Sequence, residues 1–285
     1  MRNRPLFGPG GNSLAFYEAG YKATKQAPAW VKGIGLDAYE YEAGKGVNAG
    51  EGALREIGEA ARRAGIYMSL HAPYFISLSG VVPETRLNSI TYIDKSLWAA
   101  DLLGADVIVV HTGSAAKITR EEAMRLAADT LYKTLETVGY PHVRIGLETM
   151  GKKNQLGTLD EVITLCKMDP RLCPVVDFGH LNARDCGGVY QSADDYLRTF
   201  DKIANALGDD VARNLHCHFS RIEWTPQGEK RHLTFADTVW GPAFEPLMEA
   251  ICREGLTPTL ISESDGTQSD DALTMKRYYD SIREE

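Results

Sequence analysis

The chain has few cysteines, no long apolar run and no excess of positive charge, and each shortage removes a class of protein. Its five cysteines are odd in number and form no Cys-x-x-Cys pair, which argues against a disulfide framework and a thiolate zinc site. No apolar stretch approaches the roughly 20 residues of a membrane span. The start of the chain has basic residues but no apolar segment before its glycines, so we expect no secretory signal and a cytoplasmic protein.

The formal net charge of −8 at pH 7 counts against a broad basic surface for nucleic acid. Phosphate binding draws its affinity from lysine and arginine, which release counterions from the phosphates. The charge does not exclude DNA, because bound metal ions add positive charge that a residue count omits. Charge alone therefore leaves both a sugar and a nucleic acid open as the substrate.

Strand and helix patterns alternate along the chain from a first strand near Phe7. Short apolar runs of strand type are separated by segments with apolar residues at helical spacing, several of which end at glycine. Strands that alternate with helices predict a parallel sheet, and eight such units predict closure into a barrel. We expect one α/β domain over residues 1–285, a single (β/α)₈ TIM barrel. Residues 221–241 show no periodicity and are expected to form a long functional loop.

Histidines and carboxylates stand at the ends of the predicted strands, and one more histidine, His232, follows in the EKRH segment of the expected loop. In a (β/α)₈ barrel the C-terminal strand ends converge on one face, where residues serve catalysis. Imidazole and carboxylate ligands without thiolates suit Zn²⁺, Mn²⁺ or Fe. The segments are SLHAPY with His71, VIVVHTGS with His111, IGLETM with Glu148, PVVDFGH with Asp177 and His180, NLHCHFS with His216, EKRH with His232 and LISES with Glu263.

The carboxylates make the stronger part of this argument. A single histidine at a strand end is more often a hydrogen-bonded structural residue than a ligand. Glu148 and Glu263 each end a buried run, and a buried carboxylate is costly unless it is paired or binds a cation. Asp177 and His180 form an Asp-x-x-His pair that brings an oxygen and a nitrogen ligand to one strand end. Together these residues predict a metal site.

From about Ile66 to Gly266 the chain resembles the endonuclease IV family of zinc-dependent abasic-site endonucleases, which have xylose-isomerase-like barrels. The segments that carry the resemblance are HAPYFISL, VVHTGS, LETMGKKNQLG, VVDFGH, LHCHFS, KRH and SES. The resemblance implies three zinc ions. The first would be bound by His71 and His111, with Glu148 bridging to the second. Asp177, His216 and Glu263 would complete the second, His180 and His232 would bind the third, and Glu148 and Glu263 would be the catalytic carboxylates.

The family pattern is broken at three places, the last of which is the first sixty residues, where the family's early segments that contact DNA do not occur. Its third-ion segment reads Asp-Arg-His, whereas this chain has Lys230-Arg231-His232, so one carboxylate is missing and Glu229 is its candidate substitute. A lysine beside an ion would weaken the third site. The second break puts His218 two residues after His216, on the same face of the strand, where it is open as an extra ligand or as a general acid or base.

The resemblance implies hydrolysis of a phosphodiester 5′ to an abasic site in duplex DNA, as in base-excision repair. Tyr74 matches the family's aromatic after the first histidine, where it would contact the opened DNA or pack at the barrel rim. An alternative is a sugar isomerase or epimerase, in which one Mn²⁺ or Mg²⁺ is bound by Glu148, Asp177, His216 and Glu263 and the carboxylates transfer protons. A third interpretation is a barrel that binds a ligand without catalysis.

Overall fold

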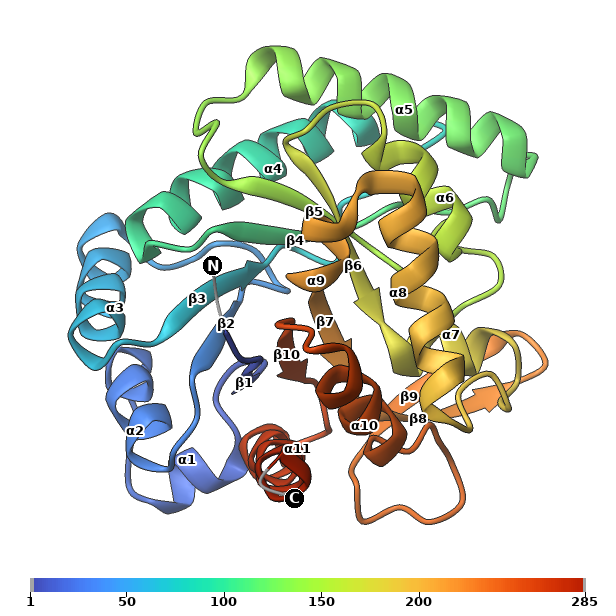
Figure 1. Cartoon of the computed structure of the whole chain (residues 1–285). Coiled ribbons are helices and arrows are strands. Elements are labelled where there is room, and N and C mark those ends of the chain that lie inside the picture. Colours follow the sequence, from blue (N-terminus) through green and yellow to red (C-terminus); the bar gives the residue numbers. More distant parts are fainter. Residues whose placement is uncertain (1–2, 284–285) are drawn as a thin grey trace.

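Eight parallel strands form the centre of the molecule and close into a barrel (Figure 1). The computed structural model describes residues 3–283, so residues 1–2 and 284–285 of the predicted domain lie outside it. The strand order is β1-β10-β7-β6-β5-β4-β3-β2. Hydrogen bonds from Asp37 N to Phe7 O and from Gly11 N to Glu40 O, each 2.9 Å, join β1 to β2. The predicted TIM barrel is confirmed. The barrel strands are β1 Leu6–Pro9, β2 Ala38–Glu42, β3 Tyr67–His71, β4 Val107–His111, β5 Arg144–Glu148, β6 Leu172–Asp177, β7 His216–Phe219 and β10 Thr259–Ser262.

Helices surround the barrel, and local capping explains where several of them begin and end. Thr119 caps the first turn of α5, and Thr158 and Glu161 form a capping box on α6. Gly65 and Gly104 end α3 and α4 in the left-handed conformation. The helices are α1 Leu14–Glu18, α2 Ala27–Gly33 after a 3₁₀ turn η1 at Thr24–Gln26, α3 Glu51–Ala64, α4 Pro83–Leu103, α5 Arg120–Thr137, α6 Leu159–Cys166, α7 Phe178–Arg184, α8 Ala193–Leu207, α9 Asp209–Arg213, α10 Glu245–Glu254 and α11 Gln268–Arg283.

The core lies inside the barrel and between the barrel and its helices. In β4 the four apolar residues before His111 are fully buried, as expected for a parallel strand covered on both faces. Side chains at the C-terminal strand ends are therefore held by a rigid frame. Within residues 3–283 no helix combines the length and apolarity that crossing a membrane requires.

Two segments differ from the expectation of loops. Within residues 221–241, β8 Arg221–Thr225 and β9 Gly228–Leu233 pair as an antiparallel hairpin beside α7 (Figure 1), with Gly228 at its turn in a positive-φ conformation. The chain after β6 also does not enter a loop, because α7 begins at once. Asp177 caps this helix, since its Oδ1 accepts a hydrogen bond from His180 N at 2.7 Å.

Candidate metal centre

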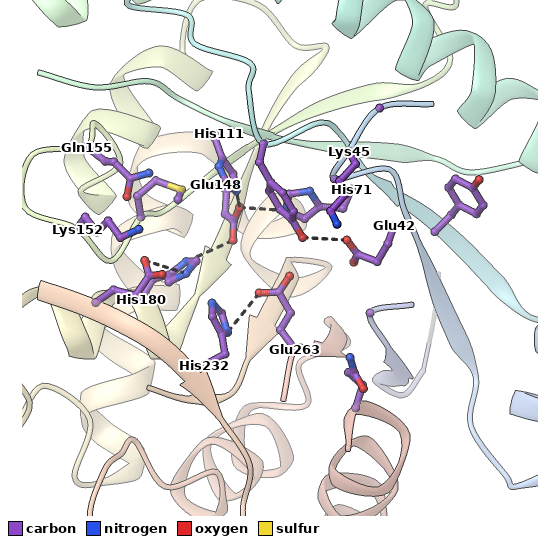
Figure 2. A pocket seen from close by; sticks show the side chains of 18 of the residues that line it. Glu42, Lys45, His71, His111, Glu148, Lys152, Gln155, His180, His232 and Glu263 are labelled. Carbon is purple, nitrogen blue, oxygen red and sulfur yellow. Dashed lines mark hydrogen bonds and ion pairs between the residues drawn. The ribbon is translucent and has the colours of Figure 1, made fainter. Parts of the chain in front are cut away.

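Six of the seven histidines converge on the C-terminal end of the barrel interior, together with six carboxylates. They surround or underlie a cavity of about 800 Å³, in which the labelled side chains point toward a common centre (Figure 2). The seventh, His142, lies exposed on the surface beside Asp101. The histidines are His71, His111, His180, His216, His218 and His232, and the carboxylates are Glu40, Glu42, Glu148, Asp177, Glu229 and Glu263.

Glu148 occupies the middle of the cluster and is fully buried. Its Oε2 lies 3.1 Å from His111 Nε2 and 3.5 Å from His71 Nε2, and its Oε1 lies 3.1 Å from His218 Nδ1 and 3.4 Å from His180 Nδ1. Burial raises the pKa of this carboxyl, but hydrogen bonds from the four histidines outweigh burial and hold the pKa well below its usual value. Glu148 is thus an anion with imidazoles on both sides.

The first group of candidate ligands is His71, His111 and Glu148. His71 Nδ1 lies 2.8 Å from the carbonyl oxygen of Ala72, which fixes the proton on Nδ1 and aims Nε2 at Glu148. A backbone acceptor on one ring nitrogen is the usual device that orients a metal-binding histidine. Burial lowers the pKa of His71, but the hydrogen bond to Glu148 and the charges of nearby carboxylates outweigh it and raise the pKa to about 10. A cation, either a proton or a metal ion, is therefore favoured here.

The second group is Glu148, Asp177, His218 and Glu263. Asp177 uses Oδ1 to cap α7, and its Oδ2 is buried without an aligned hydrogen-bond donor. Burial raises the pKa of Asp177 to about 6. Burial also raises the pKa of Glu263, but the charge and hydrogen bond of His218 outweigh it and lower that pKa to about 2. Buried oxygens without donors are what a carboxylate-bound cation would satisfy.

The third group is His180, Glu229 and His232. His180 Nδ1 lies 3.0 Å from the carbonyl oxygen of Thr149, which leaves Nε2 facing Glu229 Oε2 at 3.5 Å. His232 Nδ1 lies 2.8 Å from Ser220 Oγ, and its ring packs edge-on to that of His180. Two imidazoles and one carboxylate are a ligand set that suits zinc.

A β-bulge explains how Glu229 joins this group. Glu223 pairs with Arg231, whereas the next residue, Trp224, pairs with Glu229, so Lys230 is the extra residue on β9. The bulge brings Glu229 and His232 to one side of the hairpin although they are three positions apart. Lys230 points away, and its Nζ lies 2.6 Å from Glu223 Oε1. Lys230 therefore does not lie beside the third group, and Glu229 stands where the substitute carboxylate was expected; the strength of the third site stays a prediction.

His216 does not lie where the sequence placed it. The group that contains Glu148, Asp177 and Glu263 contains His218, which pairs in register with Asp177, whereas His216 pairs with Val175. His216 is thus two residues deeper in the barrel, and its Nε2 lies 2.9 Å from Glu40 Oε2. His218, and not His216, occupies the position expected of the second-ion histidine.

Two carboxylates of β2 were missed from the sequence. Glu40 is fully buried beneath the cavity beside His216 and His218, and Glu42 lines the cavity. Burial raises the pKa of Glu42 to about 7, with the charges of Glu40 and Glu263 adding to the rise and that of His71 opposing it. The alternation AYEYE is the signal that would have found them, because both glutamates fall on one face of a strand.

Tyr74 lies at the rim of the cavity and is 55% exposed. Its ring packs against those of His71 and His111, and its hydroxyl donates to Glu42 Oε2 at 3.3 Å. Lys45 and Lys152 also line the cavity (Figure 2). The rim thus offers an exposed aromatic ring and two ammonium groups to a ligand, and contact of Tyr74 with DNA stays a prediction.

Comparison with known proteins shows which barrels the chain is similar to. A sequence model of the family described as xylose isomerase-like TIM barrel matches residues 28–280. An uncharacterized protein of Methanocaldococcus jannaschii is 29% identical over 250 residues, which cover 87% of this chain and 89% of that one. A probable endonuclease 4 of Acholeplasma laidlawii is 32% identical over 161 residues, which cover 55% of this chain and 54% of the endonuclease. The match to that endonuclease therefore spans about half of each chain.

Solved structures with this fold have two kinds of described activity. A D-tagatose 3-epimerase-like protein superposes with a TM-score of 0.72 at 18% identity, covering 98% of both chains. Endonuclease IV from Thermus thermophilus superposes with a TM-score of 0.66 at 19% identity, covering 97% of this chain and 100% of that one. At such identities the superpositions establish the fold alone.

Proposed function

The chain belongs to the xylose isomerase-like TIM barrel family, and from that premise we propose that it is a zinc-dependent phosphodiester hydrolase that cleaves DNA 5′ to abasic sites. The observation that carries the proposal is the presence of three candidate ligand groups around one cavity. A one-metal isomerase needs the second group alone, so His71, His111, His180, Glu229 and His232 would have no role in it. In a centre with two or three ions, each residue of the three groups would bind an ion.

In this proposal each group has its own task. His71, His111 and Glu148 would hold a first ion, and Glu148 with Asp177, His218 and Glu263 would hold a second. His180, Glu229 and His232 hold the third ion on the wall formed by the hairpin. Bound ions of this kind activate water and stabilise charge on the attacking and leaving oxygens of a phosphodiester. Glu148 and Glu263 are the proposed catalytic carboxylates, since both line the cavity.

The rim provides for a nucleic acid despite the negative net charge. Lys45 and Lys152 would neutralise backbone phosphates, and Tyr74 would pack against the sugar or base exposed at the lesion. A half-exposed aromatic ring at the entrance of a metal site is suited to that contact. The proposed partner is therefore duplex DNA that contains an abasic site.

The test is cleavage of a labelled duplex oligonucleotide that carries one abasic site, by protein whose metal content has been measured. We expect at least two ions per chain, cleavage that a chelator abolishes and zinc restores, and no cleavage of the undamaged duplex. His111→Asn should lower cleavage at least tenfold, whereas His142→Asn serves as the matched control because His142 is exposed beside Asp101. Fully metallated protein without cleavage would refute the proposal.

A sugar epimerase is the second candidate, and one observation favours it. The second group has three carboxylates and one histidine around a single position, which is a complete ligand set for Mn²⁺ or Mg²⁺. Epimerisation through an enediol exchanges a carbon-bound hydrogen with solvent. Incorporation of deuterium from D₂O into a ketohexose by protein that leaves abasic DNA intact would establish this activity in place of the first.

A further inference from the structure

Beneath the floor of the cavity lies a second, fully enclosed cluster, of which the proposed function uses only His218. It consists of Glu40 from β2 with His216 and His218 from β7, all at most 4% exposed. In the strand order, β2 and β7 are separated by β1 and β10, so Glu40 reaches across the barrel interior. None of the three side chains lines the cavity.

Glu40 contacts both histidines through their Nε2 atoms. Its Oε2 lies 2.9 Å from His216 Nε2 and also accepts a hydrogen bond from Ser69 Oγ at 2.7 Å. Its Oε1 lies 2.8 Å from His218 Nε2. The ring N–H does not point at this oxygen, so neither atom has a hydrogen-bond partner of good geometry. A small turn of the ring about the broad χ2 torsion would align them. Glu40 is thus the closest group to this nitrogen of His218.

The opposite nitrogen of the same ring faces the second ligand group. His218 Nδ1 lies 3.1 Å from Glu148 Oε1 and 3.3 Å from Glu263 Oε1, in the second ligand group. An imidazole that donates Nε2–H has its lone pair on Nδ1, which is the form that a metal requires. The ring therefore joins a buried carboxylate on one side to the candidate metal position on the other.

The contacts at Glu40 are short. Its oxygens lie 2.8 Å from His218 Nε2 and 2.9 Å from His216 Nε2, which are distances that charge-assisted hydrogen bonds have. Glu40 is therefore suited to hold both imidazoles.

We infer that Glu40 is a positioning residue, which binds Nε2–H of His218 and thereby presents Nδ1 of that ring to the second ion of the proposed centre. His216 and Ser69 hold Glu40 in place from the same buried layer. The inference rests on the proposed metal centre, and it adds to it a carboxylate that the family pattern did not supply. Outer carboxylates of this kind change metal affinity by roughly 10–100-fold when they are removed.

The chemistry of Glu40→Gln makes a sharp test. A carboxylate accepts from both histidines, whereas an amide has one accepting oxygen and one donating nitrogen. The glutamine of the variant can accept a hydrogen bond from Nε2–H of only one of the two histidines. The other histidine must then take the opposite tautomer or lose its hydrogen bond to residue 40. Ser69→Ala removes one hydrogen bond to Glu40 and is a milder variant should Glu40→Gln fail to fold. Glu42→Gln makes the same carboxylate-to-amide change two residues along the strand without contacting His218.

Two measurements separate the inference from the proposed function. In chelator-treated protein, a proton–nitrogen correlation spectrum of the imidazoles should show the Nε2–H of His218 far downfield and protected from exchange. It should move upfield in Glu40→Gln, less so in Ser69→Ala, and stay in place in Glu42→Gln. In competition with a zinc chelator, Glu40→Gln should bind the second ion about 10–100-fold more weakly than wild type.

The outcomes are distinct. Wild-type protein that binds zinc, with Glu40→Gln binding it equally tightly and an unchanged His218 resonance, overturns the inference and leaves the proposed function standing. Coordination of zinc through Nε2 of His218 also overturns it. Wild-type protein that takes up no zinc refutes the proposed function and, with it, the role of Glu40 toward an ion.

Discussion

Glu229 and Lys230 are neighbours on β9, yet only substitution of Glu229 should weaken zinc binding. Glu229 faces His180 in the third ligand group, and its backbone N is held by Gly151 O at 3.1 Å, so Glu229→Gln should keep the backbone in place while it removes the anionic ligand. Lys230 is half-exposed and paired with Glu223. Lys230→Gln also replaces a charged side chain by a neutral amide, one residue away and with the opposite sign of charge removed, and is the matched control.

The magnitude follows from binding linkage. Free zinc at a hundred times the dissociation constant of the third ion stabilises the folded protein by about 2.7 kcal/mol. Loss of an outer carboxylate weakens a metal by roughly 10–100-fold, so we take loss of the ligand itself as about a hundredfold. At the same zinc concentration, zinc would then stabilise the folded variant by only about 0.4 kcal/mol. With about 2–4 °C of melting temperature per kcal/mol, the zinc-dependent rise should shrink by about 5–9 °C in Glu229→Gln.

Lys230→Gln should leave the zinc-dependent rise unchanged. The exposed pair with Glu223 contributes only about 0.2–1 kcal/mol, and that contribution does not depend on zinc. The assay is a thermal melt of each variant with and without buffered zinc, together with metal analysis after dialysis. A smaller rise in Lys230→Gln, or a full rise in Glu229→Gln, would show that the bulge does not place these residues as described.

Three further predictions concern the shared ligand, the rim and the protons of the site. Glu148 belongs to both the first and the second ligand group, whereas Glu229 belongs to the third alone. Glu148→Gln should therefore lose at least one more metal ion per chain than Glu229→Gln. An equal loss in the two variants would contradict the bridging role of Glu148. Tyr74→Ala should weaken binding of abasic duplex while it changes the melting temperature little. Tyr132→Ala on α5, where the tyrosine is similarly exposed, is the control. Equal binding of the duplex by both variants would show that Tyr74 is not part of the interface. Because the pKa of His71 is raised to about 10, its ring is protonated at pH 7 and must lose that proton to bind a metal, so zinc affinity should fall as pH falls. Calorimetry in buffers of different protonation enthalpy should record the released protons, and heats that do not depend on the buffer would count against this.

The barrel and the strand-end positions were predictable because they follow from local pattern. Buried parallel strands are continuous apolar runs, so a histidine or glutamate that ends such a run is conspicuous, as His111 and Glu148 are. The Asp-x-x-His pair was recognisable for the same reason, although the helix that Asp177 caps was not anticipated.

The missed residues depend on long-range geometry. Glu40 and Glu42 alternate with tyrosines, a pattern that in an open sheet indicates a solvent-facing edge, and only closure of the barrel turns that face inward. The choice between His216 and His218 depends on the register of β7 against β6, which no local signal sets. The bulge at Lys230 depends on pairing across the hairpin, so the sequence indicated Glu229 as a substitute but gave no means of placing it.

Asp177 combines two tasks in one carboxylate, and this affects how related sequences are interpreted. One oxygen caps α7 and the other faces the ligand cluster, so loss of the side chain costs about 0.5–2 kcal/mol of helix capping whether or not a metal binds. A descendant that had abandoned metal chemistry would still be under selection to keep Asp177 for folding. His111 and Glu229 have no such second duty in the described residues. Their retention or loss in a lineage is therefore the better record of whether the proposed metal centre is kept.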